Sequence, residues 1–160
     1  MRAYFFGNFY LSSIQQGIQA AHVTHEMFVK YNAGDMRADT MLWEWANAHK
    51  TMILLNGGMA SDLLSIENVL NSTANPYPWA AFREEEAALN NSITSVGVIL
   101  PSKIYEGAAT MRSIGWTLND LSDANGVLNL PGPGMTQTAE RYTRFDGLLM
   151  QRMNQCGLAK

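Results

Sequence analysis

The sequence predicts an α/β protein: a small mixed four-stranded sheet with helices on both faces, in the order β-α-α-β-α-β-β-α, plus a C-terminal helical extension. Two observations predict this class. Short apolar segments of strand length alternate with longer segments whose apolar residues recur every three or four positions. The chain of 160 residues also has the usual size of one domain, and 47% hydrophobic against 16% charged residues suits a folded core.

The first strand and the first helix are expected in the N-terminal segment. Residues 2–11, RAYFFGNFYL, are rich in aromatics and typical of a buried strand. A helix should follow from Ser13 to about Tyr31, with a capping box from Ser13 to Gln16 or, in the alternative register, from Ser12 to Gln15. Steps of three and four predict its packing face: Ile14, Ile18, Ala21, His25 and Phe28. The same steps predict a polar face: Gln15, Gln16, Gln19, His22 and Glu26.

The other elements of the first hundred residues follow from the same periodicities. Helices are expected over residues 39–50 and 61–70, and strands over residues 51–56, 79–82 and 92–100. The predicted packing residues of the two helices are Met41, Leu42 and Trp45, then Leu63, Leu64, Ile66 and Leu70. Prolines before Trp79 favour a strand end or a sheet edge there. The segment REEEAALNN, which follows, suits a loop or one helical turn.

The composition changes after Pro101, so we divide the chain into a core of residues 1–101 and a helical extension of residues 102–160 packed on the same domain. Helices are expected over residues 102–119 and 136–153, with Thr136 or Thr138 as the cap of the second. The segment DANGVLNLPGPGM between them is predicted to be a loop. Arg141, Arg144 and Arg152 on the last helix form either a basic stripe for phosphate or, by default, a solvated face.

Composition limits the classes of function. The formal charge of −3 and the pI near 5.5 do not indicate a nucleic-acid-binding domain, although a local basic patch would suffice for one. Cys156 is the single cysteine, so the chain can form neither an internal disulfide nor a thiolate metal site. No segment has the pattern of a signal peptide or the length of a membrane span. We therefore expect a soluble cytoplasmic protein without a membrane partner.

The first helix and the acidic segment carry the candidate chemistry. His22 and His25 lie three residues apart, but a zinc site needs a third ligand, so local hydrogen bonding is favoured over metal binding. Gly17 costs a helix about 1 kcal/mol against alanine. It indicates either close packing of the helix on the sheet or room for a ligand beside the helix start. The run Glu84-Glu85-Glu86 is either a solvated turn or a carboxylate placed at the carboxyl end of the sheet.

These segments resemble the type 2 peptidyl-tRNA hydrolases. That family has the stretch Gly-Lys-Ile-Ala-Ala-Gln-Cys-Ser-His-Ala after its first strand, and residues 17–26 here are GIQAAHVTHE. The glycine, both alanines and the histidine coincide, and Thr24 replaces the serine. A later Arg-Asp motif of the family is matched by Arg83-Glu84. The resemblance covers about residues 2–101 and implies a small α/β fold that cleaves the ester between a peptide and tRNA without a metal or another cofactor.

The resemblance also implies the site residues. It assigns substrate binding to five positions: Gly17, Gln19, Thr24, His25 and Arg83. The family lysine and threonine positions carry Ile18 and Ala88, so the family mechanism has to change. The family glutamine and aspartate positions carry His22 and Glu84, and we expect His22 to act as a general base on water, oriented by Glu84.

Three hypotheses of function follow. In the first, the chain hydrolyses peptidyl-tRNA and binds tRNA. In the second, it is a catalytically impaired member of the fold, encoded by a bacteriophage, that binds or inhibits a host protein or RNA. In the third, it is an oligomeric structural protein whose last helix docks on a second copy through apolar residues: Tyr142, Phe145, Leu148 and Leu149.

Overall fold

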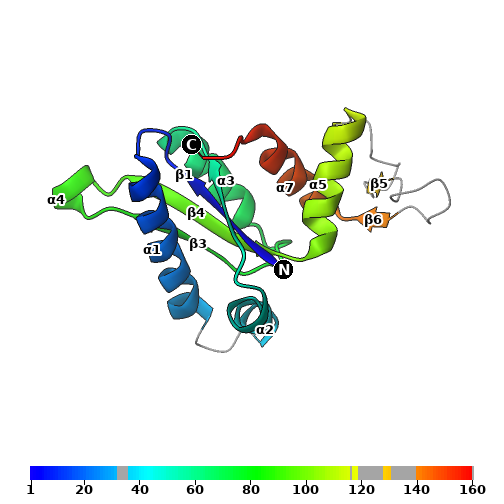
Figure 1. Cartoon of the computed structure of the whole chain (residues 1–160), viewed down its shortest axis with the longest axis horizontal. Helices are drawn as coiled ribbons and strands as arrows, with labels where there is room; N and C mark the ends of the chain where they lie inside the picture. The colour runs from blue at the N-terminus through cyan, green and yellow to red at the C-terminus, as the bar shows by residue number, and fades with distance from the viewer. Residues whose placement is uncertain (32–35, 116, 119–127, 131–139, 160) are drawn as a thin grey trace. The chain divides into compact units, whose positions relative to one another are not determined.

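The computed structural model describes residues 1–31, 36–115, 117–118, 128–130 and 140–159. Its main sheet has four strands in the order β2-β1-β4-β3 (Figure 1). Strand β1 (Arg2–Gly7) pairs parallel with β2 (Met52–Asn56) and antiparallel with β4 (Ile93–Leu100). Strand β4 also pairs antiparallel with β3 (Trp79–Arg83), which lies at one edge of the sheet. The predicted mixed four-stranded α/β fold is confirmed.

The helices of this part of the chain follow the predicted order. They are α1 (Ser13–Tyr31), α2 (Met36–Glu44) continued by the π-helical turn η1 (Trp45–His49), α3 (Ala60–Leu70) and the single turn α4 (Glu86–Leu89). The second helix begins earlier than expected, at Met36. The first strand was predicted too long. It ends at Gly7 because the side chain of Asn8 accepts a hydrogen bond from the Tyr10 amide at 3.1 Å, in a turn that exposes Phe9 and Tyr10.

Helix α1 begins with the Ser12–Gln15 capping box, the alternative register of the prediction. The Ser12 hydroxyl accepts a hydrogen bond from the Gln15 amide at 3.3 Å, and the Gln15 side chain accepts one from the Ser12 amide at 3.0 Å. Because these two bonds satisfy amides at the start of the helix, they fix where α1 begins.

The predicted packing face of α1 is wrong except at Phe28, which packs against the buried cluster of the core. Ile14 and Ile18 are 76% and 50% exposed. The residues buried instead are Gln16, Gln19, Ala20, Val23, Met27 and Tyr31. Two glutamines lie on this buried face. Gln16 Nε2 donates to the Leu11 carbonyl at 2.9 Å, whereas Gln16 Oε1 has no hydrogen-bond partner among the described residues. Gly17 is exposed, and a Cβ added there would meet nothing within 4 Å. Close packing of α1 on the sheet is therefore not the reason for a glycine at this position.

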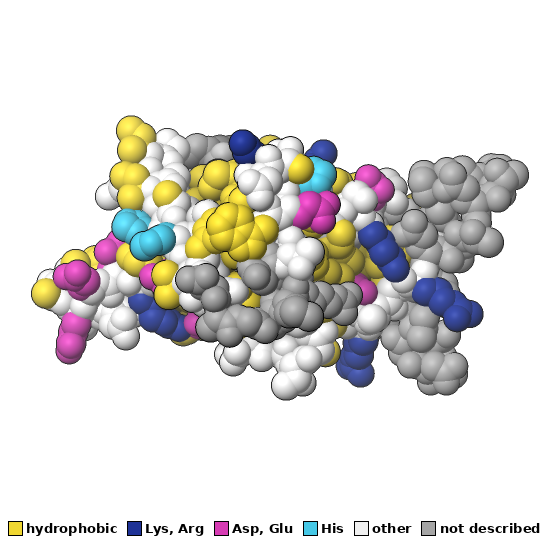
Figure 2. Space-filling model, turned by 90° about the horizontal axis from the view of Figure 1, so that it is seen from below, with side chains coloured by type: hydrophobic (Ala, Val, Ile, Leu, Met, Phe, Trp, Pro, Cys, Tyr) yellow, Lys and Arg dark blue, Asp and Glu magenta, His cyan; other side chains and the backbone are white. Residues whose placement is uncertain are grey.

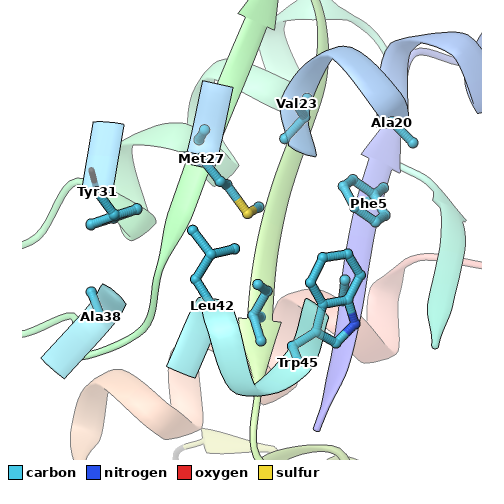
Figure 3. Packing of buried hydrophobic residues seen from close by; sticks show 11 residues of the cluster. Phe5, Ala20, Val23, Met27, Tyr31, Ala38, Leu42 and Trp45 are labelled. Carbon is cyan, nitrogen blue, oxygen red and sulfur yellow. The ribbon is translucent and has the colours of Figure 1, made fainter. Parts of the chain in front are cut away.

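A buried hydrophobic cluster joins α1 to one face of the sheet and to the α2–η1 segment. Figure 3 shows Val23 and Met27 of α1 on one side of the cluster and Leu42 and Trp45 of the α2–η1 segment on the other. Phe5 of β1 lies next to Val23 and Trp45. Side chains alternate along a strand, so Phe6 points to the opposite face. There it lies near α3, because a Cβ added at Gly57 would be 2.5 Å from Leu63 and 2.9 Å from Phe6. Helices therefore cover both faces, as predicted.

The two edges of the sheet differ. The edge at β2 is covered by the end of the chain: the Asn56 amide donates to the Gly157 carbonyl at 2.8 Å, and the Ala159 amide donates to the Leu54 carbonyl at 3.0 Å. Leu55 and Leu158 form an antiparallel bridge between them. The edge at β3 is the one that the prolines before Trp79 predicted. The sheet therefore has one covered edge, at β2, and a second edge formed by β3.

The chain divides into two compact units, Met1–Leu100 with Cys156–Lys160, and Pro101–Gln155. The second unit contains four described elements: α5 (Ser102–Ile114), β5 (Leu128–Leu130), β6 (Glu140–Tyr142) and α7 (Arg144–Gln155). The prediction of a helix over residues 136–153 is wrong at its start, and the predicted loop contains β5, which pairs with β6. Arg141 lies in β6, so the three arginines share no helical stripe. No described helix has the length and hydropathy needed to cross a membrane.

A capping box explains why α7 begins at Arg144. The Thr143 hydroxyl accepts a hydrogen bond from the Asp146 amide at 3.1 Å, and the Asp146 carboxylate accepts one from the Thr143 amide at 2.9 Å. The caps predicted at Thr136 and Thr138 lie outside the described residues. Of the expected packing residues, Tyr142, Phe145 and Leu149 are buried and Leu148 is 36% exposed.

Val23 of α1 packs directly over Gly97 of β4, so we expect Gly97→Ala to destabilise the fold. A Cβ there would lie 2.7 Å from Val23 Cγ1 and 2.8 Å from Phe5 Cδ1. Such overpacking lowers the free energy of unfolding by about 1–3 kcal/mol. Urea denaturation measures the change, and an unchanged midpoint would show that α1 can move away at no cost.

Gly17→Ala provides the opposite case. Gly17 is exposed, and a Cβ added there meets nothing within 4 Å. Since alanine fixes the helical backbone at lower entropic cost, we expect the free energy of unfolding to rise by about 0.5–1 kcal/mol. The same urea titration measures it, and a loss of stability would contradict the exposed position of this residue.

Candidate functional site

The candidate site lies where α1, the end of β3 and β4 meet. The buried Gln19 side chain connects the three: its Nε2 donates to Glu84 Oε1 at 2.6 Å, and its Oε1 accepts from the Thr94 hydroxyl at 3.3 Å. Thr94 is only 2% exposed. A buried amide with both ends bonded is held in one orientation, so Gln19 also fixes one oxygen of the Glu84 carboxylate.

Local backbone structure explains the position of Glu84. The register of β3 and β4 shifts between Phe82 and Arg83, and such an irregularity turns the residues that follow it. The Glu84 amide then donates to the Ser92 carbonyl at 3.1 Å, which ties the end of β3 to the start of β4. The Glu84 carboxylate is therefore anchored through its backbone and through Gln19.

His22 lies one helical turn beyond Gln19 and is exposed. Its ring stacks on Phe82 of β3, with 4.4 Å between ring centroids and 10° between ring planes. Within the described part of the chain, no hydrogen bond joins His22 to Glu84, and Gln19 bonds that carboxylate instead. The structure therefore brings Gln19 and Glu84 together and places His22 beside them, without the expected bond from His22 to Glu84.

The other predicted site residues do not join this network. The Thr24 hydroxyl donates to the Ala20 carbonyl of its own helix at 2.9 Å, and Gly17 and His25 are exposed. Arg83 pairs with Glu67 of α3 at 2.5 Å. Ile18 and Ala88, at the family lysine and threonine positions, are exposed. Among the residues that the structure describes, no three His, Cys, Asp or Glu side chains gather as metal ligands.

A pocket of about 350 Å³ lies along the edge strand β3, between α1 and α3. Its lining residues are Glu26, Val29, Lys30, Glu67, Trp79, Ala80 and Ala81. Lys30 Nζ lies 3.4 Å from the centroid of the Trp79 ring and donates to the Trp79 carbonyl at 3.2 Å. Although part of Lys30 is exposed, burial of its ammonium lowers its pKa, and the Glu67 carboxylate partly opposes that shift.

Sequence reasoning missed four residues of this region: Thr94, Phe82, Lys30 and Trp79. Nothing in the sequence distinguishes Thr94, because Ser95 beside it is a second hydroxyl in the same strand segment. The other three have roles that depend on contacts between segments far apart in the chain, which no local pattern shows.

Two comparisons with known proteins identify no relative of this chain. A scan against protein-family models finds no match, and a search of curated proteins finds none. The function therefore has to be inferred from the site residues and from the motif resemblance.

Lys30 should titrate at a lower pH than an ordinary lysine, because its ammonium is partly desolvated on Trp79. With unmodified lysines labelled with ¹³C at Cε, we expect the NMR midpoint of Lys30 to fall below the ordinary lysine pKa of 10.5. The partly buried ammonium destabilises the folded form at a pH below the lowered pKa of Lys30. The free energy of unfolding therefore rises as the pH increases from that lowered pKa to the ordinary lysine pKa. Lys30→Arg assigns the signal, and a midpoint at or above 10.5 would contradict the partly buried ammonium.

Proposed function

We propose that this chain is an ester hydrolase of the peptidyl-tRNA type, with Glu84 as its general base. The observation that carries the proposal is the buried Gln19 amide, which bonds Glu84 on one side and Thr94 on the other. Elements distant in the chain thus place one carboxylate beside the helix that resembles the site helix of the family. The motif resemblance supplies the substrate class.

The geometry suits activation of water by a carboxylate. Gln19 occupies Glu84 Oε1, which leaves the other carboxylate oxygen for a water molecule. Glu84 takes a proton as the water oxygen attacks the ester carbonyl carbon. The bond to the ribose oxygen of tRNA then breaks, and the proton passes to that leaving oxygen. Gln19 acts as a positioning residue, since it holds the carboxylate without touching substrate.

His22 has a different role in this proposal from the one its sequence position predicted. Its exposed ring rests on Phe82, beside the carboxylate rather than bonded to it. A flat ring supported from one side suits contact with the unpaired end of an RNA strand. In this proposal Glu84 is therefore the general base, and His22 contacts the RNA part of the substrate.

A non-catalytic binding function is the second candidate, because α1 exposes apolar side chains. Ile14, Ile18 and Val29 are 76%, 50% and 62% exposed, and their spacings of four and eleven residues place them on one side of α1, with His22 and His25 between Ile18 and Val29. Figure 2 shows, on one face of the molecule, hydrophobic side chains in yellow at the surface among polar, charged and histidine side chains. An apolar stripe on a helix suits contact with a protein partner.

The substitution Glu84→Gln tests the hydrolase. It keeps the size of the side chain but removes the base, so we expect the rate of peptidyl-tRNA cleavage to fall about 10²–10⁴-fold. Release of tRNA from N-acetyl-aminoacyl-tRNA measures the rate under single-turnover conditions.

Glu85→Gln is the matched control, because it removes the same charge one residue further along, at an exposed position. We expect it to keep the wild-type rate. Equal losses in both variants would point to general electrostatics and contradict the assigned base. If the wild-type protein releases no tRNA, the hydrolase proposal fails and the apolar face of α1 becomes the functional surface.

A further inference from the structure

The outer edge of β3 is partly occupied by side chains of α1. Pro78 accepts a backbone hydrogen bond from Ile99 of β4 at 3.0 Å, so alternation turns the backbone groups of the next residue, Trp79, away from β4. The Trp79 amide donates to the Tyr31 hydroxyl at 3.1 Å, and its carbonyl accepts from Lys30 at 3.2 Å. Both outward groups of Trp79 are thus satisfied.

Ala81 has the same orientation two residues further along. Its amide and carbonyl point away from β4, toward the pocket that Ala81 itself helps to line. Within the described residues, no segment of the chain pairs with this side of β3. At the β2 edge, by contrast, residues 157–159 already pair with the strand. The sheet therefore presents an open position at Ala81, with small side chains that let a backbone approach.

One carboxylate beside this edge, that of Glu26, is available to a positive group. Glu26 and Glu67 line the pocket, and Lys30 is its lining cation. Glu67 is paired with Arg83, whereas Glu26 is exposed and has no ion-pair partner in the described part of the chain. At the other end of the strand, β3 leads directly to the Glu84 carboxylate.

We propose that an extended peptide adds to the β3 edge as a further strand, with hydrogen bonds to Ala81 and a positive charge near Glu26. This rests on the proposed function for its direction: the peptide runs parallel to β3, so that its carboxyl end, which carries the ester, reaches Glu84. At about 3.3 Å per residue, about five residues span the distance from Trp79 to Glu84. Main-chain bonds of this kind accept peptides of many sequences.

The test is the binding of a five-residue peptide amide, Lys-Thr-Val-Thr-Ala-NH₂, measured by calorimetry. Ala81→Pro removes the outward amide without removing a bond to β4, a position at which sheets tolerate proline. We expect it to weaken binding about tenfold or more, while Ala81→Ser, which keeps the amide, binds as the wild type does. We also expect Glu26→Gln to reduce the preference for this peptide over its Glu-Thr-Val-Thr-Ala-NH₂ counterpart.

A second measurement covers the case in which Ala81→Pro fails to fold. Methylating alternate backbone nitrogens of the lysine peptide removes its donors and leaves the protein unchanged, so methylation in one of the two alternating registers should abolish binding. Three results would overturn the inference. The first is that Ala81→Pro binds the peptide as tightly as the wild type does. The second is that both methylated peptides bind as tightly as the unmethylated peptide, and the third is that the wild type binds no peptide. These peptides carry no ester, so the two proposals can fail separately. Ester hydrolysis without peptide binding contradicts only the peptide site at β3. Peptide binding without ester hydrolysis contradicts only the proposed function and the parallel direction of the peptide that was derived from it.

Discussion

The close approach of α1 to the sheet at Gly97 is the constraint on which the rest of the core unit depends. Because Gly97 has no side chain, Val23 can pack against β4 beside Phe5, and α1 lies close to the sheet. In this position of α1, the Gln19 side chain bonds both Glu84 and Thr94. The cluster around Met27 and Leu42 then fixes the other end of the helix (Figure 3). Packing of an apolar helix face thus sets the geometry of a polar site.

The strands and the extent of the first helix could be predicted because their signals are local. Aromatic and β-branched runs bounded by glycine or proline gave β1, β2 and β4, and the segment from Ser13 to Tyr31 is helical as expected. The buried face of α1 could not be predicted, because two stripes compete. Ile14 and Ile18 are the more hydrophobic, but the stripe of Val23 and Met27 is buried. The buried stripe also carries Gln16 and Gln19, and the partners of Gln19 come from strands far away in the chain.

The site could also be predicted only where its signals are local. Gln19 and Glu84 could be named from their places in two motifs, and they do meet. Thr94 could not, because its partner is 75 residues away in the chain. The orientation of His22 depends on Phe82, a contact between a helix and a strand that no spacing in the sequence shows. In the second unit, the cap at Thr143 was missed since residues 136–138 offered an equally good local signal.

The two α1 side chains on Trp79 also bear on how the protein behaves when it is concentrated. An uncovered strand edge is a template on which further copies can stack into aggregates. Lys30 and Tyr31 occupy the first outward backbone groups of β3, and the charge on Lys30 opposes the approach of a second identical edge. The edge that remains open around Ala81 is therefore short. Acetylation of Lys30 would remove that charge, so this one amine contributes to keeping the sheet from extending itself.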